Sequence, residues 1–442
     1  MFMALDEMGD WRKTHFTKDI TLALKGQELI LGGWVQNWRD LGGMKFIILQ
    51  DKYGERQLTM KKGEVSDEVF DLKVGYHWNV MVKGTVKEFK KAPGGVEIIP
   101  SEIRILNKTP DKLPIDMTGE TVSELDIRLD NRVLDLRSKK SQAIFRIRSE
   151  VLNSMREFLL KNNFTEITTP KIIGSATEGG TELFPIIFFE DEAFLTQSAQ
   201  LYKEQLSSVF ENVFEISPCF RAEKSRTKRH LCEIFMLDIE MAFANMHDVL
   251  KVLEEMIHYI ITNIREKNID DLKHLSMEKK TTVPEIPFPR YTYKEILNKI
   301  SNELGIEVEY GEDIPTEAYR KMESILPDYY YILDWPNKIK PFYIMPYKDN
   351  PELTESFDLQ KGWLELVSGG TRVHDKELLT KRLELKGLNP KSFESHLRMF
   401  DFGMPPHAGA GLGIARLVAV LCGLDDIREA VMYPRTPDRL TP

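Results

Sequence analysis

One glycine-rich segment near the end of the chain, GMPPHAGAGLGIARLVAVLCGL at residues 403–424, restricts the fold more than any other. Its glycines alternate with other residues and lead directly into apolar residues at helical spacing, which predicts a helix that ends at Gly423. Alternating glycines also allow a neighbouring strand or a ligand to approach the backbone closely. The glycines are Gly409, Gly411 and Gly413, and the apolar positions are Ile414, Leu417, Val418 and Leu421.

Two common nucleotide-binding loops do not match this segment. A dinucleotide loop needs the spacing G-x-G-x-x-G, a following βαβ unit and an acidic residue about 20 positions later. A P-loop needs a lysine followed by serine or threonine, and no lysine follows in that arrangement. Arg416 falls in the first turn of the predicted helix, where a fixed cation beside glycines would suit a nucleotide. A buried strand, turn and helix with a surface arginine is the alternative, and the segment alone leaves both open.

The composition restricts the kind of protein that this chain can be. A chain of 442 residues with 42% hydrophobic and 29% charged residues is typical of a soluble globular protein with two or three domains. The net charge of −9 excludes a global basic field, so a nucleic-acid partner would have to be held by local patches. Three cysteines without C-x-x-C spacing disfavour a zinc site or disulfide framework and favour a reducing, cytoplasmic compartment. No run approaches 18 apolar residues, so we expect no membrane span.

The pattern along the chain predicts two domains joined by a hinge. Residues 1–108 contain five short alternating segments separated by glycine turns, which fits a small OB-type β-barrel. Residues 109–138 are polar, carry two prolines and read as a hinge or linker. Residues 139–442 begin with an amphipathic helix and then mix strands and helices, so we expect one large α+β domain.

A basic loop between two apolar strands is the second strong signal. In FEISPCFRAEKSRTKRHLCEIFMLDIEMAF, residues 214–243, Arg221 and Glu223 are two apart and share one face of a strand. They pair a phosphate-binding cation with an acceptor for an amino group. Asp238 and Glu240 likewise share a face on the returning strand. A solvated charge run is the usual alternative, but the flanking apolar strands make it a poorer interpretation here.

Acidic residues elsewhere suggest contacts with a cation and with an amine. In SFDLQKGWLELVSGGTRVHD, residues 356–375, Asp358, Glu365 and Ser368 could supply hard oxygen ligands for Mg²⁺, with its open positions filled by substrate phosphates. In SATEGGTELF, residues 175–184, Glu178 stands in a glycine-rich loop that could close on an amine. The alternative for Glu178 is an ordinary solvated acid.

Taken in order, these segments resemble the class II aminoacyl-tRNA synthetases. FRAE…RHLCE is similar to their motif 2, GLGIAR to motif 3, and the helix followed by ITTP to motif 1, the dimer-forming segment. The barrel ahead of this core resembles the aspartyl, asparaginyl and lysyl subgroup, subclass IIb. QSAQLYK, GMPPHAG and YPR…RLTP narrow the resemblance to the aspartyl and asparaginyl members, with the layout most similar to archaeal aspartyl enzymes. The resemblance implies a catalytic antiparallel sheet flanked by helices, a cytoplasmic homodimer, and ATP, L-aspartate and tRNA(Asp) as substrates.

The resemblance also implies an ATP and Mg²⁺ site built from motifs 2 and 3. In this family the motif 3 glycines lie beneath ATP, and arginines of both motifs hold its phosphates. The implied catalytic residues are Arg221, His230, His407 and Arg416. The implied contacts are Arg221 at the α-phosphate, Glu223 at the adenine amino group, Arg229 and His230 near the γ-phosphate, Arg416 at the adenine and γ-phosphate region, Gly411 and Gly413 beneath the nucleotide, His407 beside the reacting centre, and Glu365, Ser368 and Asp358 at Mg²⁺.

Aspartate and asparagine can be separated by a physical argument. A β-carboxylate only accepts hydrogen bonds, whereas a β-amide also presents an NH2 donor. Lys203 and Arg372 match positions where aspartyl enzymes place cations, and an amide facing both would lose roughly 1–3 kcal/mol. Asparaginyl enzymes lack the lysine. The remaining pocket residues implied are Glu178 for the α-ammonium group, with Gln200, Asp238 and Ser368.

Three departures keep the asparaginyl alternative open. The loop AEKSRTKRHL reads more like the asparaginyl loop, Ile234 replaces a common phenylalanine, and Ala415 replaces a common acidic residue. An asparagine synthetase paralogue without tRNA is a further alternative, but such paralogues lack the barrel. A non-catalytic nucleic-acid-binding protein is disfavoured because pure binding has no use for the retained Arg221, Glu223, Glu365 and Arg416.

The barrel is expected to contact the tRNA anticodon. Phe46 matches an aromatic residue that stacks on the central anticodon base, although a core position in the barrel is the alternative. Gln57 and Glu97 match contacts to anticodon base edges, and Arg39 matches a phosphate contact. Pro93 favours the enzymes that also charge tRNA(Asn), while Gln36 matches neither type, so the second tRNA stays open.

Overall fold

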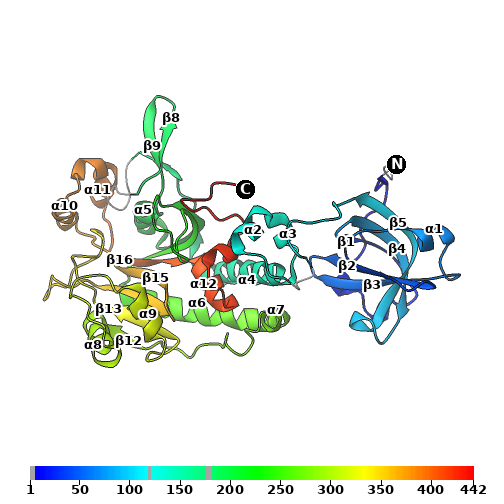
Figure 1. The fold of residues 1–442 in the computed structure, drawn as a ribbon. Helices are drawn as coiled ribbons and strands as arrows, with labels where there is room; N and C mark the ends of the chain where they lie inside the picture. The colour runs from blue at the N-terminus through cyan, green and yellow to red at the C-terminus, as the bar shows by residue number, and fades with distance from the viewer. Residues whose placement is uncertain (1–4, 118–120, 175–181) are drawn as a thin grey trace. The chain divides into compact units, whose positions relative to one another are not determined.

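The computed structural model describes residues 5–117, 121–174 and 182–442. It divides into two compact units, Met1–Gln142 and Ala143–Pro442 (Figure 1). The polar segment 109–138, expected as a hinge, belongs to the first unit. The amphipathic helix expected from about residue 139 begins at Lys139.

The first unit is built around a closed barrel with strand order β1-β2-β3-β5-β4, which confirms the predicted OB-type barrel. Its strands alternate between buried and less buried residues because successive side chains point to opposite faces. The inward side chains, among them Leu31, Ile47 and Leu58, form an apolar core. The elements are β1 (Glu28–Asp40), β2 (Met44–Asp51), β3 (Gly54–Lys61), α1 (Asp67–Asp71), β4 (Asn79–Glu88) and β5 (Val96–Asn107), followed by α2 (Leu125–Asp130) and α3 (Arg132–Asp135).

A buried histidine makes the stability of this unit depend on pH. His77 precedes β4, is 3% exposed and has a left-handed φ of 58°. Burial, with the nearby charge of Arg137, lowers the pKa of His77 from 6.5 to about 4. The unfolded chain therefore binds a proton at His77 below its own pKa while the folded chain does not. Acid thus favours unfolding as the pH falls from 6.5 to about 4.

We expect His77→Asn to make the free energy of unfolding less sensitive to acid. Asparagine tolerates the left-handed backbone and does not titrate. With this shift, His77 alone should lower the free energy of unfolding by about 2 kcal/mol between roughly pH 7 and pH 5, and the variant should lack that loss. Urea unfolding of both proteins at the two pH values measures the difference. Equal losses would show that other groups control the acid response.

The second unit contains an eight-stranded sheet with order β12-β13-β14-β15-β16-β11-β10-β6. Its central pairs are antiparallel, and only the outermost pairs, β12 with β13 and β10 with β6, are parallel within the described residues. The strands are β6 (Thr165–Glu166), β10 (Asn212–Phe220), β11 (Glu233–Ala242), β12 (Arg290–Thr292), β13 (Tyr329–Leu333), β14 (Ser356–Lys361), β15 (Leu364–Thr371) and β16 (His407–Gly413). A separate small sheet pairs β7 (Ile172–Ile173), β9 (Asp191–Leu195) and β8 (Pro185–Phe188).

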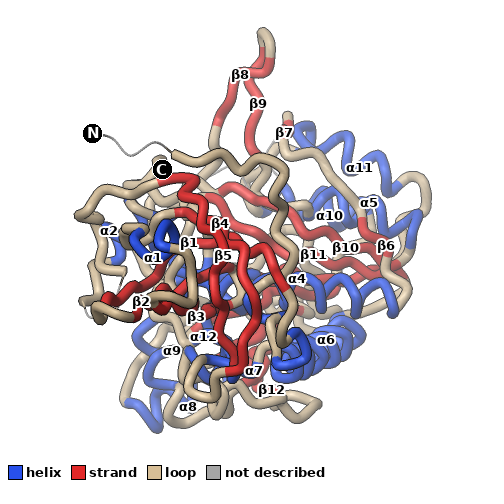
Figure 2. The backbone as a smooth tube through the Cα atoms, turned by 90° about the vertical axis from the view of Figure 1, so that its right-hand side faces the viewer, coloured by secondary structure: helices blue, strands red, loops and turns tan. Residues whose placement is uncertain are grey.

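Two long helices, α4 (Lys139–Lys161) and α6 (Met246–Lys267), cover one face of the large sheet (Figure 2). They contact each other through a buried hydrogen bond from Asn263 Nδ2 to Ser154 Oγ, 3.0 Å long. Their apolar faces share one core with inward residues of the sheet such as Leu237 and Leu412. The other helices of this unit are α5 (Gln200–Phe210), α7 (Ile269–His274), α8 (Tyr293–Leu304), α9 (Thr316–Met322), α10 (Lys376–Leu385), α11 (Glu394–Phe400) and α12 (Ile414–Cys422).

The alternating glycines of the C-terminal segment lie in β16 rather than in a loop. Gly409 pairs with Glu240 of β11, and a Cβ atom at Gly409 would collide with the Glu240 carboxylate. Only glycine therefore lets that carboxylate lie across the strand. The predicted helix follows as α12, and Gly423 ends it with a left-handed φ of 65°.

Candidate functional site

A cavity of about 280 Å³ lies on the face of the sheet opposite α4 and α6. Side chains alternate along β11, so Met236 and Asp238 line the cavity, whereas Leu237 and Ile239 belong to the core beneath. The strand register extends the floor: Asp238 lies opposite Gly411 of β16, which lies opposite Ser368 of β15. Glycine at the centre of this row leaves the space above the sheet open to a ligand.

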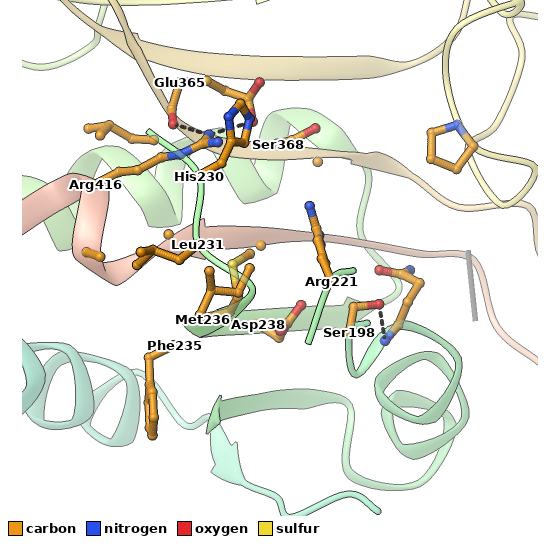
Figure 3. A pocket seen from close by; sticks show the side chains of 18 of the residues that line it. Ser198, Arg221, His230, Leu231, Phe235, Met236, Asp238, Glu365, Ser368 and Arg416 are labelled. Atoms are coloured by element: carbon orange, nitrogen blue, oxygen red, sulfur yellow. Dashed lines mark hydrogen bonds and ion pairs between the residues drawn. The ribbon is translucent and has the colours of Figure 1, made fainter. Parts of the chain in front are cut away.

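Cations and an acid gather at one end of the cavity. Figure 3 shows Arg416, His230 and Glu365 close together, with Asp238 and Ser198 farther along. Arg416 Nη1 donates to the Glu365 backbone oxygen at 2.8 Å and lies 3.5 Å from its carboxylate. Arg416 therefore keeps other guanidinium N–H groups for an anion. The side chain of Glu365 is 41% exposed and can meet a solvated cation.

The loop between β10 and β11 supplies the next group of side chains. Arg221 Nη1 lies 3.9 Å from Glu223 Oε1, and His230 Nε2 lies 3.8 Å from Glu223 Oε2. Burial, and then the charges of Arg416 and Arg229, lower the pKa of His230 to about 4. The His230 imidazole is therefore neutral at neutral pH. Several cations crowded beside one another fit a polyanionic ligand that would relieve their repulsion.

The other end of the cavity is a buried network of charges. Lys203 of α5 is 2% exposed, and its Nζ donates to Asp238 Oδ1 at 2.7 Å and to the Ala410 backbone oxygen at 3.1 Å. Arg372 donates from Nε and Nη2 to the Glu240 carboxylate at 3.0 and 3.3 Å. Lys203 Nζ also lies 3.7 Å from Glu240 Oε2, which is longer than a hydrogen bond. One N–H of Lys203 and the Nη1 group of Arg372 therefore remain for a further acceptor. Both cations line the cavity, so a ligand carboxylate can receive those donors.

Sequence reasoning missed several residues of the cavity. Lys340 and Tyr343 line it and come from the segment between β13 and β14, which carried no recognised motif. Glu240 does not line the cavity but is the ion-pair partner of Arg372, which does, and no local spacing indicates that contact. The proline and aromatic residues of KPFYIMP, residues 340–346, were the available signal.

Most of the residues predicted for ATP, amino acid and metal come together around this cavity. Ile234 and Ala415, the two departures from the family pattern, line it as well. The Phe235 ring points away from Arg221 and Arg416 in Figure 3. The predicted residues that line the cavity are Gln200, Lys203, Arg221, Glu223, Arg229, His230, Asp238, Glu365, Ser368, Arg372, Gly411, Gly413 and Arg416.

Three predicted residues are not among those lining the cavity. Glu178 lies outside the described residues. His407 is fully buried, and its Nε2 faces Glu204 Oε2 at 3.5 Å rather than the open space. Asp358 lies opposite Ser368 in the sheet, but both of its carboxylate oxygens accept from Lys340 Nζ, at 2.9 and 2.8 Å. Burial raises the pKa of Asp358 to about 6.

The residues near Glu365 fit a magnesium ion shared with a phosphate ligand. Magnesium in nucleotide sites takes one or two carboxylates and fills its other positions with water and phosphate oxygens. Glu365 and Ser368 offer oxygen atoms at the cavity, and no larger cluster of acidic, histidine or cysteine side chains that could hold a metal occurs among the described residues. A site with so few protein ligands suits an ion that enters with its nucleotide.

The outer face of the barrel brings the expected anticodon residues together. Phe46 lies opposite Arg39 on one side and Thr59 on the other, and it is absent from the barrel core that contains its neighbour Ile47. Gln57 Nε2 donates to Glu97 Oε2 at 3.2 Å. The short turn Pro93–Gly95 precedes β5. Glu97 itself is only 5% exposed, so a base edge would reach Gln57 more readily.

Two family models match the chain and agree with these two sites. The model described as tRNA synthetases class II (D, K and N) matches residues 124–437, and the model described as OB-fold nucleic acid binding domain matches residues 29–106. The chain belongs to the class II tRNA synthetases of the D, K and N group and is an aminoacyl-tRNA synthetase. No helix among the described residues is long and apolar enough to cross a membrane.

The relatives and the solved structures are named for two different amino acids, aspartate and asparagine. The chain is 47% identical over 430 residues to the aspartate–tRNA(Asp/Asn) ligase of Archaeoglobus fulgidus, covering 97% of this chain and 99% of the relative. It is 45% identical over 439 residues to the aspartate–tRNA(Asp) ligase of Pyrococcus abyssi, covering 97% and 100%. Among solved structures, the asparaginyl-tRNA synthetase of Pyrococcus horikoshii complexed with asparaginyl-adenylate superposes with a TM-score of 0.92 at 33% identity, covering 98% of this chain and all of that one.

Proposed function

We propose that the protein is an aspartate–tRNA ligase that activates L-aspartate with ATP and transfers it to tRNA(Asp). The observation that carries the proposal is the pair of buried cations, Lys203 and Arg372, each with unused N–H donors at one end of the cavity. A β-carboxylate would satisfy both, whereas a β-amide would place its own NH2 donors against one of them. The identity to relatives named aspartate–tRNA ligase supports the same choice.

In the proposed reaction, the substrate carboxylate attacks the α-phosphorus of ATP in line, and pyrophosphate leaves. Arg221 and Arg416 hold the phosphates, and Glu223 accepts from the adenine amino group. Glu365 and Ser368 would hold Mg²⁺, which supplies charge neutralisation on the phosphates. The terminal ribose hydroxyl of tRNA then attacks the aminoacyl-adenylate. Positioning and fixed cations provide the catalysis, without a protein nucleophile.

The test of this assignment is amino-acid-dependent ATP–pyrophosphate exchange, run with aspartate and asparagine side by side. We expect exchange with aspartate and little or none with asparagine at equal concentration. Exchange with asparagine alone would overturn the aspartate assignment. Exchange with neither, from folded protein, would mean that the ATP site described above does not support activation.

Asparagine is the second candidate substrate because two observations favour it. The superposition on the asparaginyl enzyme is close, and the basic loop of residues 222–231 reads like the asparaginyl loop. Against these stand the higher identity to aspartate–tRNA ligases and the buried Lys203. These two observations favour aspartate, and the exchange experiment distinguishes the two substrates.

The proposal also includes a second tRNA substrate, a homodimeric state and a cytoplasmic location. Pro93 and the relatives named for both tRNA(Asp) and tRNA(Asn) support tRNA(Asn) as a second substrate.

We propose a homodimer formed through α4 and residues 165–173, where Leu160 and Ile172 are 54% and 47% exposed. Light scattering of the purified protein measures that state. No disulfide joins the three cysteines among the described residues, which suits the proposed cytoplasmic location.

We expect Phe46→Ala to weaken tRNA(Asp) binding without changing amino-acid activation. Stacking of a base on an aromatic ring contributes about 1–3 kcal/mol, so Kd should rise roughly 5- to 150-fold. Filter binding measures Kd, and pyrophosphate exchange reports activation. Tyr76→Ala, at an aromatic residue of the same unit that is 49% exposed, is the matched control. Equal losses in the two variants would remove Phe46 from the proposed anticodon contact.

A further inference from the structure

A fully buried charged cluster lies behind the amino-acid end of the cavity. Glu204 of α5 is 0% exposed, His396 of α11 is 1% exposed, and His407 of β16 is 0% exposed. The Nε2 atoms of the two histidines lie 3.4 and 3.5 Å from the same oxygen, Glu204 Oε2. None of the three residues lines the cavity, so any effect on the reaction must act through another side chain.

Gln200 connects this cluster to the cavity. It lies one helical turn before Glu204 on α5, it lines the cavity, and its Nε2 donates to Glu204 Oε1 at 2.6 Å. A carboxylate can only accept hydrogen bonds, so the amide must turn its NH2 group toward Glu204. The carbonyl oxygen of Gln200 is then the amide atom left for a ligand in the cavity. An acceptor at that place suits an ammonium group.

The orientation of the amide holds only while Glu204 is ionised, because a protonated carboxyl group could also donate. Burial by itself would raise the pKa of Glu204, but the imidazoles of His396 and His407, whose Nε2 atoms face its Oε2, bring it below the ordinary value for a glutamate. The two histidines converge on the oxygen that Gln200 does not use. They therefore keep the other oxygen available as a pure acceptor.

We propose that Glu204, held by His396 and His407, is a positioning residue that aims the Gln200 carbonyl oxygen at the α-ammonium group of the amino-acid substrate. The inference rests on the proposed place of Gln200 in the amino-acid pocket. It does not depend on the choice between aspartate and asparagine, because both carry the same α-ammonium group. It assigns to a residue outside the cavity a role in amino-acid affinity rather than in ATP binding.

The test is a double-mutant cycle on KM in ATP–pyrophosphate exchange. Glu204→Gln keeps the shape of the side chain but can present either oxygen or NH2 to Gln200, so the amide is no longer forced to one orientation. We expect KM for the amino acid to rise about 10-fold, while KM for ATP and kcat change less than about twofold. In a Gln200→Met background, Glu204→Gln should add nothing, because the group it acts through is gone.

A purely structural role for Glu204 gives a different result. Glu204→Gln would then raise KM equally in both backgrounds, or would leave KM unchanged while lowering stability, and either outcome overturns the proposal. Glu204→Asp keeps an acceptor-only group and should restore most of the affinity. If Glu204→Gln does not fold, Glu204→Leu and its combination with Gln200→Met complete the same cycle.

A control variant and a choice of substrate separate this inference from the assignment of function. Glu254→Gln replaces another buried carboxylate, on α6, that accepts from the Phe288 backbone and lies outside the cavity. It should leave both KM values at the wild-type level. The cycle is run with whichever amino acid the wild-type protein activates. Exchange with asparagine alone would overturn the aspartate proposal and leave the Glu204 cycle fully testable.

Discussion

Arg221→Ala is expected to abolish most of the amino-acid-dependent ATP–pyrophosphate exchange while the protein stays folded. Arg221 lines the cavity close to Glu223, where a cation would meet the charge that builds on the α-phosphate. Removing an arginine that stabilises a phosphoryl-transfer transition state lowers the rate by a factor on the order of 10³ or more. The loss should appear mainly in kcat, because the interaction strengthens as the reaction proceeds.

The matched control for Arg221 is Arg226→Ala in the same loop. Arg226 is 72% exposed at its side chain, pairs with Asp438 and does not line the cavity. A surface ion pair of this kind contributes about 0–1 kcal/mol to stability, so exchange should stay near the wild-type rate. Arg221→Lys should recover part of the activity, since a point charge remains but the planar fork is lost. Exchange near the wild-type rate in Arg221→Ala would remove this arginine from the proposed chemistry.

The barrel could be predicted from the sequence because its signal is local. The alternation that places Leu31 inside and neighbouring residues outside repeats every two residues, and glycine turns separate the runs. The observed strand β1, Glu28–Asp40, coincides with the alternating run ELILGGWVQNWRD. Phe46 was ambiguous by pattern alone, since an aromatic residue suits either face of a strand. Its partners on the two adjacent strands, Arg39 and Thr59, and its absence from the barrel core place it on the outer face.

The cavity could be predicted where its residues are close in sequence or belong to a recognised motif. Arg221 and Glu223 share a strand face, so their proximity follows from spacing. The contact of Glu204 with His396 and His407 brings three distant segments together, and no local pattern signals it. Such contacts depend on which elements the topology brings together.

The predicted magnesium ligands are a second case in which the sequence alone is insufficient. Asp358 and Glu365 have residue types suited to Mg²⁺, and the sequence offered no reason to separate them. In the structure Lys340, from the segment between β13 and β14, donates to the Asp358 carboxylate, while Glu365 faces the cavity beside Arg416. The lysine already neutralises the charge of the Asp358 carboxylate, and a metal ion would have to displace it. The Glu365 carboxylate needs no such exchange. That difference is a property of the fold rather than of the residue.

Lys203→Met is expected to lower kcat/KM for aspartate by about 100-fold or more, and to change kcat/KM for asparagine far less. The N–H group that Lys203 keeps for a ligand would be lost, and truncating one partner of a buried charged contact costs roughly 2–5 kcal/mol. An amide whose NH2 group faces this donor makes no hydrogen bond to it, so asparagine loses no contact when the lysine is removed. Pyrophosphate exchange with each amino acid, at saturating ATP, measures the change in discrimination.

Stability has to be separated from specificity in this variant, because Lys203 is also the partner of Asp238. Removing the lysine leaves the Asp238 carboxylate, which is 3% exposed, without its cation, and a broken buried pair costs about 3–5 kcal/mol of folding free energy. The double variant Lys203→Met/Asp238→Asn removes both charges and should regain most of that stability, measured by thermal unfolding. Aspartate activation should stay low in the double variant, because the donor is still missing. If aspartate and asparagine lose activity equally in the stable double variant, the buried lysine does not determine the choice between them, and the basic loop becomes the better guide to the substrate.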